Sequence, residues 1–167
     1  MHELAITVIG PDRTGIVADV AEALAGVGAN LTDSTMTRLR GHFTMTLVCA
    51  GPTAAEVAKA LEPLTDVVTS VRQVSPEAGA GEAGEPYVVS VHGADRLGIV
   101  AAVTRVVAVG GGNITDLSTR LSGTLYVLVA EVDLPPGTAD ELAQQLAVAA
   151  SELGVEVTLR RAESEIL

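Results

Sequence analysis

An internal repeat constrains the fold of this chain more than any other feature of its sequence. Residues 8–33 and residues 91–116 align at an offset of 83, and about half of the aligned positions are identical. One residue is then lost in the second copy, so that the Thr-Arg-Leu run at residues 37–39 aligns with residues 119–121. A repeated pattern of this length predicts two similar small domains, because each copy buries its apolar residues in the same way.

The stretch between the copies has the composition of a linker. Residues 75–86 contain Gly, Pro, Ala, Ser and Glu and no large apolar side chain, which is typical of a solvated connecting segment. We therefore predict a first domain at residues 1–75, a flexible linker at 76–86, a second domain at 87–162 and a short tail at 163–167.

Each copy shows the pattern of a strand, a helix, two strands, a second helix and a closing strand. Residues 4–9 and 87–91 favour strands, and apolar side chains then recur at helical spacing from Ile16 and from Ile99. The sequence predicts an α+β fold made of two ferredoxin-like βαββαβ units in tandem. Each unit is an antiparallel sheet with both helices on one face.

The second helix of each copy starts with the same signal. Thr53 stands three residues before Glu56, and Thr138 stands three residues before Glu141. This spacing is that of a capping box, in which the Thr hydroxyl and the Glu carboxylate satisfy free backbone N–H groups. We expect both boxes to form.

The helix-free face of each sheet needs cover if it is apolar. Alternating apolar residues in the central strands are expected on these faces, and they favour a homodimer. These residues are Phe43, Met45 and Leu47 in the first copy and Leu125, Val127 and Val129 in the second.

The repeated motif carries a resemblance to a known family. Each copy reads strand, Gly-x-Asp-Arg-x-Gly-Ile-Val, helix, Gly-x-Asn-(Leu/Ile)-Thr-Asp. This motif resembles the ACT domain, a small ligand-binding regulatory module, and the tandem arrangement is similar to the glycine cleavage system transcriptional repressor family. The family often has Pro before the second glycine of the motif, where this chain has Thr14 and Leu97.

The resemblance implies that a free amino acid binds at the loop between the first strand and the first helix, with residues of a neighbouring domain completing the site. A helix N-terminus attracts a carboxylate, and a glycine there lets backbone approach a ligand closely. An aspartate suits an ammonium group, and an asparagine offers both a donor and an acceptor. The candidate ligand-binding residues are Asp12, Arg13, Thr14, Gly15, Ile16, Asn30 and Leu31 in the first copy and Asp95, Arg96, Leu97, Gly98, Ile99, Asn113 and Ile114 in the second.

The same residues also have structural interpretations. Asp12 and Asp95 suit a turn in which the carboxylate caps the following helix. Arg13 and Arg96 suit surface ion pairs. The two loops are near-equals in sequence, so the sequence does not select one of them as the binding site.

Charge and residue content exclude several other classes of function. The net charge is −11 and aromatic residues make up 2%, which argues against direct nucleic-acid binding and against an anionic membrane surface. The single cysteine, Cys49, excludes an intrachain disulfide, and the N-terminus lacks the pattern of a signal peptide. We expect a cytoplasmic protein. No spacing of His, Cys or acidic residues predicts a metal site, a catalytic set or a cofactor site.

These observations favour a non-enzymatic, amino-acid-binding regulator that acts through a protein partner. A transcription factor is one such partner, and the chain would then regulate transcription indirectly. The alternative is a stand-alone regulatory subunit that confers feedback on an amino-acid biosynthetic enzyme. A catalyst in its own right is disfavoured, because no acid–base or nucleophile set can be assembled from the sequence.

Overall fold

Alternating burial along the strands builds each sheet. In β1 (Glu3–Pro11) the side chains of Leu4, Ile6 and Val8 are buried, and the residues between them are more exposed. This is the pattern of a strand with one covered face. The computed structural model describes residues 3–75 and 84–163. The predicted linker residues 76–83 and tail residues 164–167 lie outside the described part.

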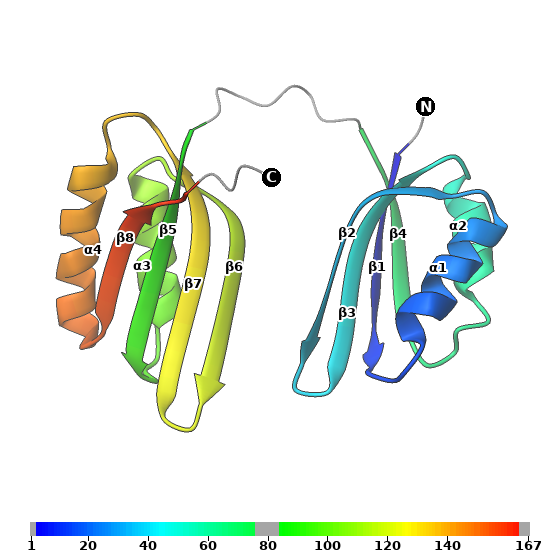
Figure 1. Ribbon diagram of the computed structural model, residues 1–167, viewed down its shortest axis with the longest axis horizontal. Helices are drawn as coiled ribbons and strands as arrows, with labels where there is room; N and C mark the ends of the chain where they lie inside the picture. Colours follow the sequence, from blue (N-terminus) through cyan, green and yellow to red (C-terminus); the bar gives the residue numbers. More distant parts are fainter. Residues whose placement is uncertain (1–2, 76–83, 164–167) are drawn as a thin grey trace. The chain divides into compact units, whose positions relative to one another are not determined.

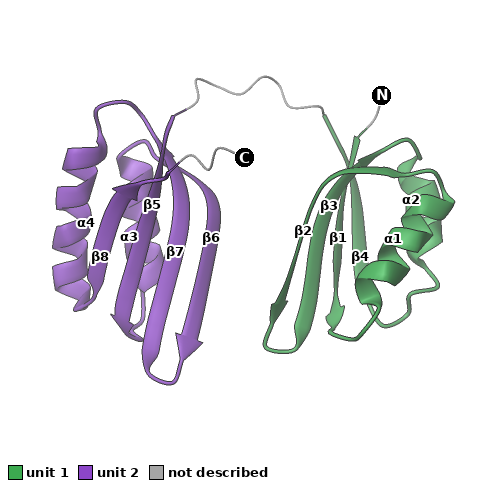
Figure 2. Cartoon of the chain, viewed as in Figure 1, with its two compact units in different colours: residues 1–79 green, residues 80–167 purple. Residues whose placement is uncertain are grey.

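The chain divides into two units, residues 1–79 (unit 1) and residues 80–167 (unit 2), shown in Figure 2. Both units have the element order βαββαβ, as expected (Figure 1). Unit 1 contains β1, α1 (Ile16–Gly26), β2 (Asn30–Leu39), β3 (His42–Ala50), α2 (Ala54–Leu61) and β4 (Val68–Val74). Unit 2 contains β5 (Glu85–Ala94), α3 (Ile99–Val109), β6 (Asn113–Ser122), β7 (Leu125–Leu134), α4 (Ala139–Leu153) and β8 (Glu156–Arg161).

The two sheets have the same topology, which confirms the predicted fold class. Their strand orders are β2-β3-β1-β4 and β6-β7-β5-β8, and every pairing is antiparallel. Both helices of a unit lie on one face of its sheet (Figure 1). Each unit has its own buried apolar cluster between helices and sheet. None of the helices in the described ranges combines the length and apolar character that a membrane span needs.

We predicted that apolar residues of one strand in each unit lie on the face of the sheet without helices. This prediction is wrong for unit 1 and confirmed for unit 2. Phe43, Met45 and Leu47 are buried in the core between the sheet and the helices. In β7 the exposed Leu125 and Val129 alternate with buried residues, so they face away from the helices. In β3 the apolar set alternates with His42, Thr44 and Thr46, and such a strand packs its apolar side against the covering helices.

The strand pairing contradicts the predicted loss of one residue in the second copy. Gly10 pairs with Phe43 and Gly93 pairs with Tyr126, both at the offset of 83. The next strands keep this offset, because Arg38 pairs with Phe43 and Leu121 pairs with Tyr126. The Thr-Arg-Leu runs are therefore not structurally equivalent.

The first of the two expected capping boxes forms, and the second does not. At the start of α2, Thr53 Oγ1 accepts from the Glu56 N–H at 3.2 Å, and the Thr53 N–H donates to Glu56 Oε2 at 2.8 Å. At the start of α4, Thr138 instead donates its hydroxyl to the Pro135 carbonyl at 2.7 Å. Its ψ of −7° is not the extended conformation of a capping residue.

The start of unit 2 also differs from the expectation. Glu85 and Pro86 have the composition of the linker, but they are the first residues of β5 and pair with Leu134 and Asp133.

Candidate ligand-binding loops

The loops from β1 to α1 and from β5 to α3 have the same backbone geometry. Each helix begins after a glycine in the left-handed conformation, Gly15 with φ of 86° and Gly98 with φ of 90°. Other residues rarely adopt this conformation. A Cβ built on either glycine would meet no atom within 4 Å. Both loops therefore present open backbone at a helix N-terminus, where N–H groups attract an anion.

The interpretation of Asp12 and Asp95 as helix caps is wrong. The N-cap residues are Gly15 and Gly98, and neither helix has a side-chain cap. The following residues, Ile16 and Ile99, are 3% and 2% exposed. Their side chains belong to the core, so only their backbone is available to a ligand.

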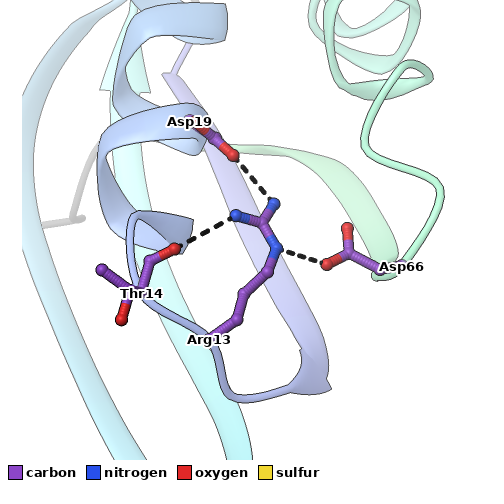
Figure 3. A network of polar contacts seen from close by, with 4 residues as sticks. All are labelled: Arg13, Thr14, Asp19 and Asp66. Carbon is purple, nitrogen blue, oxygen red and sulfur yellow. Dashed lines mark hydrogen bonds and ion pairs between the residues drawn. The ribbon is translucent and has the colours of Figure 1, made fainter.

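In unit 1 the arginine of the loop is held by two carboxylates (Figure 3). Arg13 Nε donates to Asp66 Oδ2 at 2.6 Å, and Arg13 Nη2 lies 2.8 Å from Asp19 Oδ2. Arg13 Nη1 donates to the Thr14 carbonyl at 3.5 Å. The hydrogen bonds to Asp66 and Asp19 raise the pKa of Arg13, and the bond from Arg13 lowers the pKa of Asp66. The structural interpretation of Arg13 as an ion-pair residue is confirmed.

The aspartate of the same loop also has a partner. Arg38 Nη1 in β2 lies 3.5 Å from Asp12 Oδ2. The Asp12 N–H donates to the Gly41 carbonyl at 2.9 Å, which joins the loop to the β2–β3 turn. Both charged side chains of the unit 1 loop are therefore paired within the unit.

Unit 2 keeps the loop residues and lacks their partners. At the offset of 83, Ala102 stands where Asp19 stands in unit 1, and Leu121 stands where Arg38 stands. The closing strands pair at an offset of 88, with Ile9 opposite Val68 and His92 opposite Glu156. Gly154 is therefore the counterpart of Asp66.

The guanidinium of Arg96 lies where this correspondence predicts. A Cβ built on Gly154 would be 3.5 Å from both Cζ and Nη2 of Arg96. Within residues 3–75 and 84–163, neither Arg96 nor Asp95 has an ion pair. The unit 2 loop thus carries one unpaired cation beside one unpaired anion.

Two grooves adjoin this loop. One, of about 560 Å³, is lined by residues 95–101 and by Tyr126 of β7. The other, of about 900 Å³, follows α3 from Gly98 to Gly112, Asn113 and Ile114. Backbone of the loop borders both grooves.

Asn30 lies far from the loop of its own unit, whereas Asn113 lines the larger groove of unit 2 together with Gly98. Asn30 pairs with Ala50, and Ala50 pairs with Glu3 at the start of β1, whereas the loop follows Pro11 at its end. At about 3.3 Å per residue, roughly 26 Å of strand separates the two ends. Leu31 and Ile114, next to the asparagines, pack against the cores. The structure therefore does not bring Asn30 to the unit 1 loop.

Sequence reasoning missed the partners of the loop charges. Asp19 and its counterpart Ala102 were visible in the aligned copies, because the offset of 83 holds there. Asp66 and Gly154 were not, because the second helices differ in length and the offset changes to 88.

Other titratable groups offer no metal site in the described ranges. No group of three His, Cys, Asp or Glu side chains there is arranged to hold a metal ion. His92 Nε2 lies 2.7 Å from Glu156 Oε2 on the adjacent strand. Cys49 is buried, and burial raises the pKa of its thiol.

The comparisons agree with this architecture. The model of the ACT domain family matches residues 2–73 and residues 85–160, so it covers most of both units. The UPF0237 protein MJ1558 of Methanocaldococcus jannaschii is 39% identical over 75 residues, which are 44% of this chain and 83% of that protein.

Two solved structures match along nearly the whole chain. An unknown protein from Galdieria sulphuraria has a TM-score of 0.83 at 31% identity, covering 97% of this chain and 99% of that one. A "putative glycine cleavage system transcriptional repressor" has a TM-score of 0.72 at 20% identity, covering 98% of each chain. At this identity the second likeness shows the fold alone.

Proposed function

This chain belongs to the ACT domain family, and on that premise we propose that it is a non-enzymatic regulatory protein that binds a free amino acid. Its two ACT domains are those that the family model matches, at residues 2–73 and 85–160. Amino-acid binding changes the surface that a protein partner recognises. The protein acts in the cytoplasm, without contacting nucleic acid or membrane directly.

The open backbone at the twin loops carries this proposal. Gly15 and Gly98 add no side chain at the helix N-terminus, and a Cβ built on either would meet no atom within 4 Å. The backbone N–H groups there suit the carboxylate of an amino acid. The proposed contacts of the carboxylate are the backbone N–H groups of residues 13–16 or 96–99, with Asn30, Leu31, Asn113 and Ile114 as further site residues.

A homodimer is part of the proposal. Asn30 lies at the opposite end of its sheet from the loop, so it reaches a loop-bound ligand only from another sheet. The uncovered apolar residues of β7 supply a surface for association with a second copy.

The partner is proposed to be a protein of transcription, so that regulation is indirect. The net charge of −11 opposes contact with a phosphate backbone, and this favours a protein over DNA as the target. Capture of the full chain's partner from host lysate, with and without added amino acids, tests this step. A transcription factor supports the proposal, and an amino-acid biosynthetic enzyme would instead identify the chain as a feedback subunit.

Calorimetry against each of the twenty amino acids tests ligand binding directly. We expect one or a few of them to bind at micromolar to millimolar concentration. Asn113→Ala should weaken that binding by about 1–3 kcal/mol, because a polar group of the ligand is left unpaired. If none of the twenty binds at millimolar concentration, the loops are structural turns and the chain is an interaction scaffold.

A further inference from the structure

The two loops differ in how their charges are paired, although their sequences and backbones match. We propose that the ACT units divide their roles: the unit 1 loop is locked by its ion pairs, and the unit 2 loop is the one that responds to an amino acid. This inference rests on the proposed function, because it states which copy of the site is used. We call Arg13, Asp19 and Asp66 the Arg13 clamp.

The clamp occupies all three nitrogens of the Arg13 guanidinium. Nε and Nη2 are within 2.8 Å of the Asp66 and Asp19 carboxylates, and Nη1 donates to the Thr14 carbonyl (Figure 3). A ligand carboxylate would have to displace one of these aspartates. It would also approach two negative charges already in place, which disfavours its binding.

The clamp also ties the unit 1 loop to its surroundings. Asp19 lies in the first turn of α1, and Asp66 lies in the segment that leads into β4. Asp12 adds a contact to Arg38 of β2. Contacts from several elements hold the loop in one arrangement, and such a loop has little freedom to change when a ligand arrives.

Three substitutions remove these ties from unit 2. Ala102, Gly154 and Leu121 replace the two aspartates and the arginine, while Asp95 and Arg96 are retained. The Arg96 guanidinium still lies over residue 154, at 3.5 Å from where a side chain would begin. The anchoring charges are lost, but the position of the arginine is kept.

The unpaired charges of unit 2 complement the two charges of an amino acid. Arg96 is a donor for a carboxylate, and Asp95 is an acceptor for an ammonium group. They are adjacent in the chain and line the 560 Å³ groove with Tyr126. The unit 1 loop has the same two residue types, but both are already satisfied within the unit.

The experiment follows the backbone amides of Gly15 and Gly98 by NMR in the full-length, ¹⁵N-labelled chain. The probe is a mixture of the twenty amino acids at millimolar concentration, followed by titration with each member. We expect the Gly98 amide and its neighbours in residues 95–99 to shift, with the amides of residues 12–16 unchanged.

Restoring a clamp in unit 2 provides the matched variant. Ala102→Asp places a carboxylate where Asp19 stands, so it should pair with Arg96 and weaken the response at Gly98 at least tenfold. Ala102→Asn has the same shape without the charge and should retain most of the response. Circular dichroism and the dispersed spectrum of each variant confirm that it is folded.

The outcomes separate the two proposals. A shift at Gly15 equal to that at Gly98, or equal losses in Ala102→Asp and Ala102→Asn, overturns the division of roles and leaves amino-acid binding standing. An absence of shifts at both loops overturns amino-acid binding and the division of roles together.

Discussion

Arg13 Nε donates a 2.6 Å hydrogen bond to Asp66 Oδ2, across 53 residues of sequence. The bond connects the loop before α1 to the segment before β4. Asp19 lies 2.8 Å from the same guanidinium. Unit 2 lacks the equivalent bond, because Gly154 has no side chain to replace Asp66.

The Asp66 carboxylate should make stability depend on pH in acid. The bond from Arg13 lowers the folded-state pKa of Asp66 below its ordinary value of 3.8. The stabilisation is therefore fully present above that value and is lost as pH falls through the lower folded-state pKa. Urea unfolding should show the parent more stable than Asp66→Asn at neutral pH, with the difference vanishing in strong acid.

Salt provides the control for this pH effect. The Arg13 and Asp66 side chains are about two-fifths exposed, so high salt should screen the pair and shrink the difference at neutral pH. A difference that stays constant from neutral pH to strong acid would show that the Asp66 charge does not act through this bond.

A methyl group added to Gly10 should destabilise the chain more than one added to Gly93. The Cβ on Gly10 would lie 2.6 Å from the Asp66 carbonyl oxygen, which is backbone. On Gly93 it would lie 3.0 Å from Val155 Cγ1 and 3.2 Å from Val155 Cα, so the overlap to be relieved is smaller. We expect Gly10→Ala to cost about 3 kcal/mol and Gly93→Ala about 1 kcal/mol. Urea unfolding of the two variants measures the costs, and equal values would contradict the difference in packing.

The fold could be predicted from the sequence because its signals repeat. Two copies of the same strand, loop and helix pattern support one another, and the family match confirms them. The glycines Gly15 and Gly98 mark the loops because the left-handed backbone there favours glycine. Local signals such as these can be identified without knowing the tertiary contacts.

The features that the sequence did not reveal depend on tertiary register. Arg96 lacks the ion pair that Arg13 makes with Asp66, because Gly154 stands at the equivalent position. This equivalence appears only when β8 is paired with β5. In β7 the outward-facing set begins with Leu125, Val127 and Val129 and ends with Glu131 and Asp133, so the first half of the strand alone does not indicate the core face. Thr138 has the spacing of a cap, but its hydroxyl bonds to Pro135 instead.

The glutamates of the two expected capping boxes should contribute differently to the free energy of unfolding. Glu56 accepts from the Thr53 N–H at 2.8 Å, so Glu56→Ala removes half of a formed box and should cost about 0.5–1 kcal/mol. Glu141 has no such bond, and Glu141→Ala should be near neutral. Urea unfolding of each variant gives the comparison, and an equal loss at Glu141 would mean that the second box forms in solution.

Cys49 should react slowly with thiol reagents in the folded chain. Its side chain is buried in the unit 1 core, and burial raises the pKa of its thiol, so little reactive thiolate is present. Reaction with a disulfide reagent at neutral pH should be much slower than in denaturant. A native rate equal to the denatured rate would show that the unit 1 core opens readily.

The uncovered face of unit 2 should mediate the proposed dimer. Val129 in β7 is 39% exposed and lies on the face without helices, and its counterpart in unit 1 is the polar Thr46. On this face β7 of unit 2 has exposed apolar residues, whereas the equivalent strand β3 of unit 1 has none. A charge there should disfavour burial of the face against a second copy, because an unpaired buried carboxylate is costly.

Sedimentation equilibrium of matched variants tests this prediction. Val129→Asp should weaken dimerisation at least tenfold, which corresponds to about 1.4 kcal/mol. Thr46→Asp adds the same charge at the equivalent position of unit 1 and should leave the dimer unchanged. A parent chain that sediments as a monomer at high micromolar concentration would contradict dimerisation. Equal weakening by both variants would instead mean that the association depends on net charge or on both sheet faces, and not on the apolar residues of β7.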